Sequence, residues 1–248
     1  MLIYGINPVL EALRAGRATA VRVSPRADDR LTALVRLAEE RGIAVRRVDV
    51  RELDRAVRGG VHQGVVADVE DRAPFGVEDL VVQAAGVPLL VVLDGIEDPQ
   101  NVGAILRTVD AAGADGVVRQ SRHAAPLGGA TAKASAGAST HVKVADVVNI
   151  ARAIEALKTA GVWTVGLAGD AERSYDQIDY TVPTAFVVGA EGTGLRRLVR
   201  ERCDWVVSIP MAGHVQSLNV SVATAVALYE AVRQRRARGQ PTTGGPRR

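Results

Sequence analysis

The sequence of 248 residues predicts an α/β protein with a mostly parallel sheet covered by helices, preceded by a small N-terminal α/β domain. Two observations predict this fold class. From Pro88 onward, nearly continuous apolar segments alternate with segments of helical periodicity, which is typical of parallel strands buried on both faces. Before Pro88, the charged run Glu70-Asp71-Arg72 and then Pro74 interrupt the pattern. The sequence therefore predicts a first domain at 1–70, a linker at 71–87 and a second domain at 88–238.

In the first domain, capping residues and periodicity predict the elements in turn. Asn7 followed by Pro8 is typical of a helix N-cap with proline at the first helical position, and Gly16 is expected to end that helix. Asp28 or Asp29 is expected to cap a second helix that runs to position 42. The remaining expected elements are strands at 20–24, 43–48 and 64–69 and a helix at 50–57.

In the second domain, strands and helices are expected to alternate to the end of the sheet. The strands are expected at 89–93, 116–118, 141–144, 162–167, 185–188 and 205–209. The helices are expected at 100–112, 127–138, 147–160, 195–201 and 220–236. The tail at 239–248, rich in Gly, Pro, Thr and Arg, is expected to be disordered.

The composition excludes several classes of protein. The longest apolar runs, such as 87–93, are far shorter than the ~18 residues that a membrane span needs, and the first seven residues show no signal-peptide pattern. A single cysteine, Cys203, excludes an internal disulfide framework and a cysteine-cluster metal site, and we expect its thiol to be buried and inert. The four histidines have no metal-ligand spacing. We expect a cytoplasmic protein without metal and without membrane attachment.

Charge is distributed unevenly along the chain. Residues 1–58 have net charge +4, residues 59–117 have −8 and residues 118–248 have +7, although the total is only +3. Basic ends around an acidic middle indicate a polyanionic partner that is contacted by particular faces. Of the 31 basic residues 28 are Arg, which fits either a GC-rich genome or selection for phosphate-binding forks. Aromatic residues make up only 3%, so base stacking on an aromatic platform is a poor explanation for nucleic-acid binding.

The first segment that carries chemistry follows the strand at 89–93. A dinucleotide-binding fold would place Gly-x-Gly-x-x-Gly here, and its absence argues against a classical Rossmann dehydrogenase. Asp98 and Pro99 are expected to begin the next helix. Asn101 and Arg107 lie off the apolar stripe of that helix. From the residues alone, a capping-turn Asn and a solvated Arg remain open as an alternative to functional roles.

The second segment, Gly189-Ala190-Glu191-Gly192-Thr193-Gly194, follows the strand at 185–188. Glycines near the carboxyl end of a strand allow the backbone to approach a ligand closely. The spacing differs from that of a P-loop and the P-loop lysine is missing, which indicates a nucleoside ligand rather than a triphosphate. A glycine-rich turn with Glu191 near a helix N-terminus is the alternative.

The third segment, 209–221, joins the last strand to the C-terminal helix. Ser217, Asn219 and Ser221 lie two residues apart among apolar residues. A helix cap needs only one of them, so three indicate the polar lining of a pocket, although Ser221 could also bond back to its own helix.

Together and in this order, the three segments resemble the three motifs of the TrmH family of the SPOUT superfamily. These proteins are S-adenosylmethionine-dependent ribose 2′-O-methyltransferases that act on tRNA or rRNA. The resemblance covers 88–236 and is most specific at 98–107, 189–194 and 209–221. The first domain is similar to the ribosomal-protein-like RNA-binding domain of the 23S rRNA guanosine methyltransferase branch. The matching pieces there are Ile3-Tyr4-Gly5-Ile6-Asn7-Pro8-Val9 and Val61-His62-Gln63-Gly64-Val65.

The resemblance implies roles for individual residues and a more specific fold. The family's catalytic and polar pocket residues match Asn101, Arg107, Glu191, Ser217 and Asn219. Positions that hold the methyl donor, S-adenosyl-L-methionine, match Gly189, Ile209 and Leu218. His214 and Gln216 fall where the family varies and receive no role. The family also implies a C-terminal trefoil knot, a homodimer, and RNA as the partner, with 23S rRNA favoured over tRNA because of the added N-terminal domain.

The chemistry needs a base for the ribose hydroxyl, because a sulfonium donor is already activated. Glu191 and His214 are the ordinary candidates for this base. Arg107 stays protonated, so we expect it to hold the target phosphate and to stabilise the alkoxide while a phosphate oxygen or water takes the proton.

The sequence is also compatible with two other functions. A catalytically silent RNA-binding or ribosome-assembly protein on the same fold is disfavoured by the intact polar residues. A nucleotide-dependent oxidoreductase is disfavoured by the missing glycine motif.

Overall fold

The computed structural model describes residues 1–25, 29–57, 59–70, 75–122 and 124–240. The chain divides into two compact units. Unit 1 consists of Met1–Ala73, Val102–Arg107 and Ala125–His141, and unit 2 consists of Pro74–Asn101, Thr108–Ala124 and Val142–Arg248. Unit 1 therefore includes two segments from beyond the predicted first domain. Residues 241–248 of the tail that we expect to be disordered lie outside the described residues.

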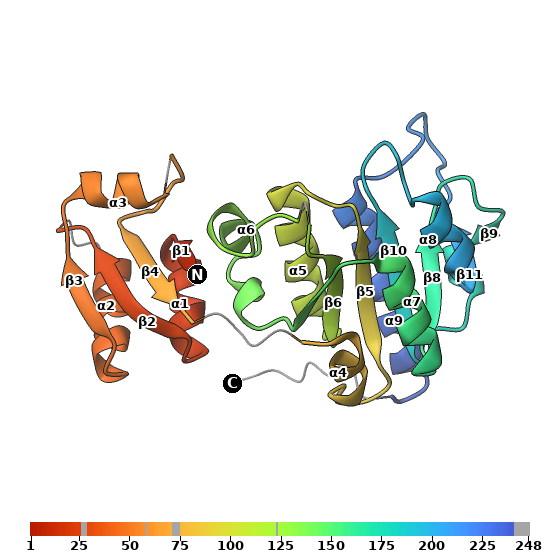
Figure 1. Ribbon diagram of the computed structural model, residues 1–248, viewed down its shortest axis with the longest axis horizontal. Helices are drawn as coiled ribbons and strands as arrows, with labels where there is room; N and C mark the ends of the chain where they lie inside the picture. The colour runs from red at the N-terminus through yellow and green to blue at the C-terminus, as the bar shows by residue number, and fades with distance from the viewer. Residues whose placement is uncertain (26–28, 58, 71–74, 123, 241–248) are drawn as a thin grey trace. The chain divides into compact units, whose positions relative to one another are not determined.

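Unit 1 contains a four-stranded sheet (Figure 1). Its strands, in spatial order, are β1 (Leu2–Tyr4), β4 (Val65–Val69), β2 (Ala18–Val23) and β3 (Ala44–Arg47). β4 pairs antiparallel with β1 and β2, and β2 pairs parallel with β3. Its helices are α1 (Ile6–Arg14), α2 (Asp29–Glu40), α3 (Val50–Val57) and α6 (Gly129–Ala134).

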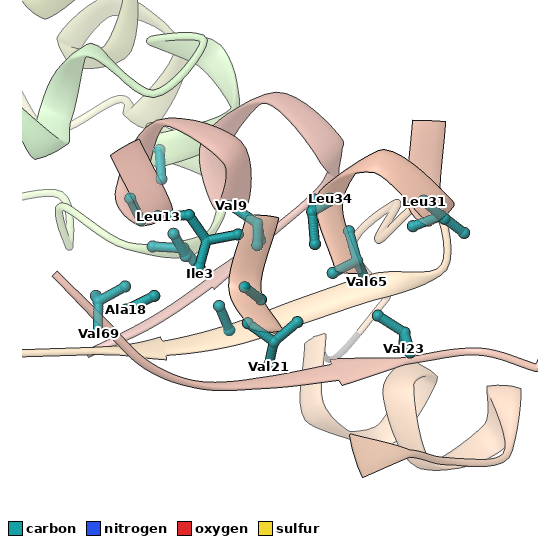
Figure 2. Close-up of a cluster of buried hydrophobic side chains, with 14 residues drawn as sticks. Ile3, Val9, Leu13, Ala18, Val21, Val23, Leu31, Leu34, Val65 and Val69 are labelled. Carbon is teal, nitrogen blue, oxygen red and sulfur yellow. The ribbon is translucent and has the colours of Figure 1, made fainter. Parts of the chain in front are cut away.

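The two faces of the unit 1 sheet are buried by different helices, as the alternation of side chains along β4 requires. Val65, Ala67 and Val69 belong to the hydrophobic cluster formed with α1 and α2, which Figure 2 shows. Val66 instead packs with Leu53 and other residues around α3.

Two predictions for unit 1 are corrected. Strand β1 was not expected from the sequence, because its three residues are too few to show alternation, and it is defined by its pairing with β4. Helix α1 begins at Ile6 with Gly5 as its N-cap, so the expected cap at Asn7 is wrong. The φ of Gly5 is +93°, a conformation that favours glycine, and Pro8 is tolerated because it stays within the first turn. The alternative cap Asp28 lies outside the described residues.

Unit 2 contains a seven-stranded sheet, and every strand pair in it is parallel. In spatial order the strands are β7 (Val144–Val147), β6 (Gly116–Gln120), β5 (Leu89–Asp94), β10 (Thr184–Gly189), β8 (Trp163–Leu167), β11 (Trp205–Ser208) and β9 (Arg173–Ser174). The helices of this half are α4 (Val77–Val82), α5 (Pro99–Ala112), α7 (Ile150–Thr159), α8 (Arg197–Arg202) and α9 (Val220–Ala237). The predicted α/β class with a mostly parallel sheet flanked by helices is confirmed.

Helices bury both faces of the central strands of unit 2, which explains why these strands are apolar throughout. Leu90 and Val92 of β5 pack in one cluster with side chains of α4, α7 and α8. Alternate residues of the same strands, such as Val91 and Phe186, point to the opposite face. Helix α9 contacts β10 and lies behind the sheet in Figure 1, so it covers that face.

The order of the strands reverses between β5 and β10. The chain proceeds from β5 to β6 and β7 toward one edge of the sheet, and the later strands build the other side from β10 outward. Ligands of open parallel sheets bind beyond the carboxyl ends of the strands at such a reversal. A ligand-binding site is therefore expected at the loops after β5 and β10.

Several boundaries beyond residue 70 differ from the predictions. The strand expected at 141–144 is β7 at Val144–Val147, and the helix expected at 127–138 is the shorter α6, followed by a 3-10 turn, η1 (Ala138–Thr140). The segment expected as a linker contains α4, whose Val77 and Leu80 are buried in the core of unit 2. Gly76 is the N-cap of α4, and its backbone N–H donates a hydrogen bond to the carboxylate of Asp79. A short sequence segment does not reveal this capping contact.

Arg235, near the end of α9, binds at the amino ends of the central strands. The loops after β5 and β10 lie at the other end of these strands. The side chain of Arg235 is buried, and its guanidinium donates to the backbone carbonyls of Tyr180, Val87, Pro88 and Val182 at 2.6–3.0 Å. These carbonyls precede β5 and β10, so one side chain satisfies backbone acceptors at the start of both central strands. In the part of the chain that is described, no helix is long and apolar enough to span a bilayer.

Candidate active site

A cavity of about 420 Å³ opens at the carboxyl ends of β8, β10 and β11. The residues that line it come from the loops after these strands and from the start of α9. They include five of the positions predicted from sequence: Gly189, Glu191, Ile209, Ser217 and Leu218. The structure therefore brings together side chains and backbone from two of the three predicted motifs around one cavity, which we name the donor cavity.

Gly189 is the position where the loop after β10 folds back most tightly. A Cβ atom built on Gly189 would collide with the backbone carbonyl group of Gly194 and the amide nitrogen of Leu195. The fold-back is closed by a hydrogen bond in which Gly194 N–H donates to Ala190 O at 2.8 Å. Gly194 itself has a φ of +65°, so the sequence needs glycine at both ends of this loop.

The first motif is joined to the other two by a hydrogen-bonded group of three side chains. Asn219 Nδ2 donates to Asn101 Oδ1 at 2.9 Å and to Glu191 Oε1 at 3.3 Å. Asn101 Nδ2 donates to Glu191 Oε2 at 3.4 Å. Each motif contributes one member, although the residues are far apart in sequence. We call Asn101, Glu191 and Asn219 the polar triad.

Helix capping places two members of the polar triad and orients the side-chain amide of one of them, Asn219. Asn219 is the N-cap of α9, and its Oδ1 accepts hydrogen bonds from Ser221 N at 2.9 Å and Ser221 Oγ at 2.6 Å. Its Nδ2 must therefore point away from the helix, toward Asn101 and Glu191. Asn101 lies in the first turn of α5, where Asp98 accepts its backbone N–H at 3.1 Å. The two caps thus place Asn101 and Asn219 at the starts of two helices, where both side chains donate to the Glu191 carboxylate.

A buried ion pair holds the loop after β10 in place, and the sequence analysis did not identify it. Asp94, at the end of β5, is fully buried and accepts Arg196 N at 2.8 Å and Arg196 Nε at 2.6 Å. Asp94 closes an otherwise wholly apolar buried strand, and a buried carboxylate requires a partner. That single charge at the end of an apolar strand is the signal that could have predicted the pair.

Arg107 is exposed on α5, and no hydrogen bond or ion pair joins its guanidinium to another residue that the structure describes. Asn101 and Arg107 are six positions apart on one helix, which separates them by about 9 Å along the axis and by about 120° around it. The structure therefore does not place Arg107 in the polar triad. Its cationic group is available for a ligand.

The remaining predicted and unassigned polar residues fall into two groups. Ser217 and Gln216 line the donor cavity, whereas His214 does not and is exposed. At the rim of the same cavity, Arg200 Nη1 donates to both carboxylate oxygens of Asp170 at 2.8 and 2.9 Å. This contact holds the pKa of the Asp170 carboxyl below its usual value.

Cys203 has a partly buried thiol in a setting that disfavours the nucleophilic thiolate. Burial raises the pKa of its thiol to about 12, and the thiol donates to Val199 O at 3.3 Å. Among the residues that the structure describes, no cluster of three His, Cys, Asp or Glu side chains could hold a metal ion.

Comparisons with known proteins match both halves of the chain. Residues 88–229 match the SpoU rRNA Methylase family, and residues 2–75 match the family described as RNA 2′-O ribose methyltransferase substrate binding. A protein of Pseudomonas syringae pv. tomato, named 23S rRNA (guanosine-2′-O-)-methyltransferase RlmB, is 46% identical over 246 residues, covering 96% of this chain and 98% of that protein. An uncharacterized tRNA/rRNA methyltransferase of Mycolicibacterium vanbaalenii is also 46% identical, over 95% of this chain and 77% of that protein.

Solved structures are similar over nearly the full length. The SpoU methyltransferase AviRb from Streptomyces viridochromogenes, in complex with the cofactor AdoMet, superimposes with a TM-score of 0.80 at 28% identity and covers 96% of this chain and 91% of its own. An AdoMet-bound rRNA methyltransferase from Sinorhizobium meliloti gives a TM-score of 0.78 at 27% identity, covering 94% and 86%. The resemblance identified from the sequence motifs is thus confirmed, and the chain belongs to the SpoU rRNA methylase family.

Proposed function

We propose that this protein transfers a methyl group from S-adenosyl-L-methionine to the ribose 2′-hydroxyl of a guanosine in 23S rRNA. The observation that carries the proposal is the polar triad beside the donor cavity, which unites three motifs in one place. The names of the similar proteins support rRNA as the substrate and guanosine as the nucleotide. We therefore propose that the protein acts in the cytoplasm, the compartment that contains ribosomes.

The residues of the donor cavity fit S-adenosyl-L-methionine. A volume of about 420 Å³ lies within the range of about 300–1,000 Å³ usual for sites of this ligand size. Ile209 and Leu218 offer apolar surface, and the tight loop at Gly189 presents backbone groups without a side chain in the way. When bound, the donor supplies an activated methyl group on a sulfonium. The protein must then bind, align and exclude water.

The acceptor hydroxyl requires electrostatic help, because it is a poor nucleophile until it loses its proton. Asn101, Glu191 and Asn219 place a carboxylate and its two amide partners near the donor cavity, and Ser217 adds a hydroxyl to its lining. Arg107 holds the phosphate of the target and stabilises the developing alkoxide, while a phosphate oxygen or water takes the proton. His214 is exposed away from the cavity lining and is not needed as the base.

The architecture of the family extends the proposal beyond the single site. Residues 1–70 bind the RNA substrate, and residues 88–238, together with α4, form the methyltransferase domain with a C-terminal trefoil knot. The active protein is a homodimer. The twelve Arg residues against eight acidic residues within 1–58 support the first of these roles.

The proposed function is tested by mapping 2′-O-methylation in ribosomal and transfer RNA from cells with and without the protein. We expect one guanosine of 23S rRNA to lose its methyl group, and purified protein with S-adenosylmethionine to restore it. A methyl group missing from a tRNA instead would reassign the substrate. Normal methylation of both RNAs in cells without the protein would favour the second candidate function, a catalytically silent RNA-binding protein. The intact polar triad argues against that function.

The double role of Asn219 gives the first mutational prediction. Serine is as good an N-cap as asparagine but has no amide to hold Asn101 and Glu191. We expect Asn219→Ser to melt like the wild type and to lose at least about tenfold in single-turnover rate, since hydrogen bonds to a charged group are worth about 1.5–3 kcal/mol. Asn219→Ala should lose the same rate and in addition about 1 kcal/mol of stability through the cap. Equal rates for Asn219→Ser and wild type would remove the polar triad from the mechanism.

Division of labour between the domains gives the second prediction. A fragment beginning at Val87 would expose the core that Val77 and Leu80 of α4 cover, so the fragment should begin at Phe75. It also keeps α6, whose Ala132 is buried in the core of unit 1, so thermal melting is used to check that the fragment is folded. We expect residues 75–248 to form a dimer and to bind S-adenosylmethionine, but to lose most affinity for RNA. RNA binding by the full chain should weaken steeply with salt, because phosphate contacts release counterions. Full methylation efficiency in the fragment would show that residues 1–70 do not select the RNA.

A further inference from the structure

A second cavity, of about 240 Å³, lies at the carboxyl ends of β5, β6 and β10. It is lined by the loops that follow these three strands, at the reversal point of the sheet. Ala190, Thr193 and Gly194 line this cavity and the donor cavity as well. The loop that carries Glu191 is therefore the wall between the two cavities. None of the roles proposed above uses the second cavity.

Among the described residues around the second cavity, one charged group of each sign has no partner. Arg196 is bound to the buried Asp94, and Arg119 Nε donates to Asp146 Oδ1 at 2.7 Å. Glu97 and Arg122 also line the cavity, and neither forms a hydrogen bond or ion pair with any other residue within the described ranges. The unpaired charges therefore sum to zero. The lining contains three Arg and two acidic side chains, but Arg119 and Arg196 are already bound to carboxylates, so one guanidinium and one carboxylate are left for a ligand. A neutral ring with both donors and acceptors matches this pair.

The size and walls of the cavity favour a single base over a whole nucleotide. Its volume of about 240 Å³ is below the range of about 300–1,000 Å³ usual for larger ligands. Leu93, Ile96, Ala124 and Ala190 supply apolar surface for the faces of a planar ring. Enzymes that modify a nucleotide commonly extrude it so that its base enters a fitted pocket.

We propose that the second cavity binds the guanine base of the target nucleotide, and this inference rests on the proposed function. Glu97 accepts hydrogen bonds from N1–H and N2–H, and Arg122 donates to O6 or N7. Adenine presents an acceptor at N1 and no amino group at C2, so a carboxylate there rejects it. With the base in this cavity, the ribose reaches the wall formed by residues 190–194, next to the polar triad. Glu97 and Arg122 are then the residues that determine specificity.

The test compares RNA fragments that carry guanosine, inosine or adenosine at the mapped position. Inosine lacks only the N2 amino group, so it removes one hydrogen bond to Glu97 and keeps N1–H, O6 and N7. We expect the wild type to methylate inosine about tenfold more slowly than guanosine in single-turnover reactions, and adenosine more slowly still. In Glu97→Ala the ratio of the guanosine rate to the inosine rate should fall to about one.

Two further variants separate recognition of the base from a general loss of activity. Arg122→Ala should slow guanosine and inosine RNA by the same factor, about tenfold, because both bases keep O6 and N7. Glu78→Ala removes an exposed carboxylate from α4, before β5, and should change neither rate nor ratio. Glu97→Gln keeps one acceptor and should retain measurable rates with a reduced ratio. Calorimetric titration with S-adenosylmethionine checks that every variant keeps an intact donor cavity.

The outcomes distinguish this inference from the proposed function. Equal wild-type rates on guanosine and inosine, or an unchanged ratio in Glu97→Ala and Glu97→Gln, would overturn the guanine pocket while leaving the methyltransferase assignment in place. A wild-type protein that binds the donor but methylates none of the three RNAs would overturn the proposed function, and the guanine pocket with it.

Discussion

Gly189→Val is expected to bind S-adenosylmethionine about 100-fold more weakly than the wild type, the equivalent of about 2.7 kcal/mol. The reason lies in the loop after β10, where any Cβ at this position collides with backbone atoms of Gly194 and Leu195. Backbone atoms cannot move aside as the end of a flexible side chain can. The loop must open, and the wall of the donor cavity moves with it.

Calorimetry measures this effect directly, and thermal melting shows whether the fold survives. Gly213→Ala is the matched control, because a Cβ at Gly213 meets nothing within 4 Å and the residue lies in the loop after β11 without lining the donor cavity. We expect the control to bind the donor normally. A donor affinity for Gly189→Val within about twofold of the wild type would show that the tight loop has no part in donor binding.

Arg107→Ala is expected to lower the single-turnover rate of methylation by roughly 10²–10³-fold, or about 3–4 kcal/mol, by analogy with the removal of one oxyanion donor. Arg107 is exposed and has no partner among the described residues, so its removal leaves no buried group unsatisfied. Stability should therefore stay within about 0.5 kcal/mol of the wild type. A group that stabilises charge only as the hydroxyl ionises lowers turnover much more than binding.

The variants around Arg107 are chosen to separate charge from geometry. Arg107→Lys keeps the charge but cannot form two parallel hydrogen bonds to a phosphate, so it should recover only part of the rate. Arg152→Ala, at an exposed arginine in the first turn of α7, is the control and should be as active as the wild type. Donor affinity should be unchanged in all three variants. Near-normal turnover in Arg107→Ala would identify Arg107 as a solvated helix residue.

The sequence predicts the local parts of this fold well, because they depend on local signals. Asp98 and Pro99 begin α5 where expected, and the predicted helix at 50–57 coincides with α3. The elements that were missed depend on partners distant in sequence. β1 exists because β4 pairs with it, and α4 exists because Val77 and Leu80 enter a core built later in the chain. No window of a few residues contains that information.

The same distinction applies to the site. The resemblance to a known family pointed to Asn101, Glu191 and Asn219, but it gave no reason for their contact. That contact follows from the capping role of Asn219, which orients its amide, and from the Asp98 cap, which holds the first turn of α5. The pair of Asp94 and Arg196 was missed because the two residues are 102 positions apart and meet only when β5 and β10 are neighbours. Arg235 was missed because a basic helix end normally faces solvent, whereas here it is buried.

The hydrogen bonds of Arg235 join residues that are made early and late in the synthesis of the chain. During synthesis the early segments leave the ribosome first. The carbonyl of Val87 therefore has no bond to Arg235 until that residue, 148 positions later, has been made. The last helix carries Arg235 near its end and is capped by Asn219 at its start. A chain released before Arg235 is made lacks the donor that satisfies the carbonyls before β5 and β10. The amino ends of both central strands therefore gain this support only when synthesis of the last helix is nearly complete.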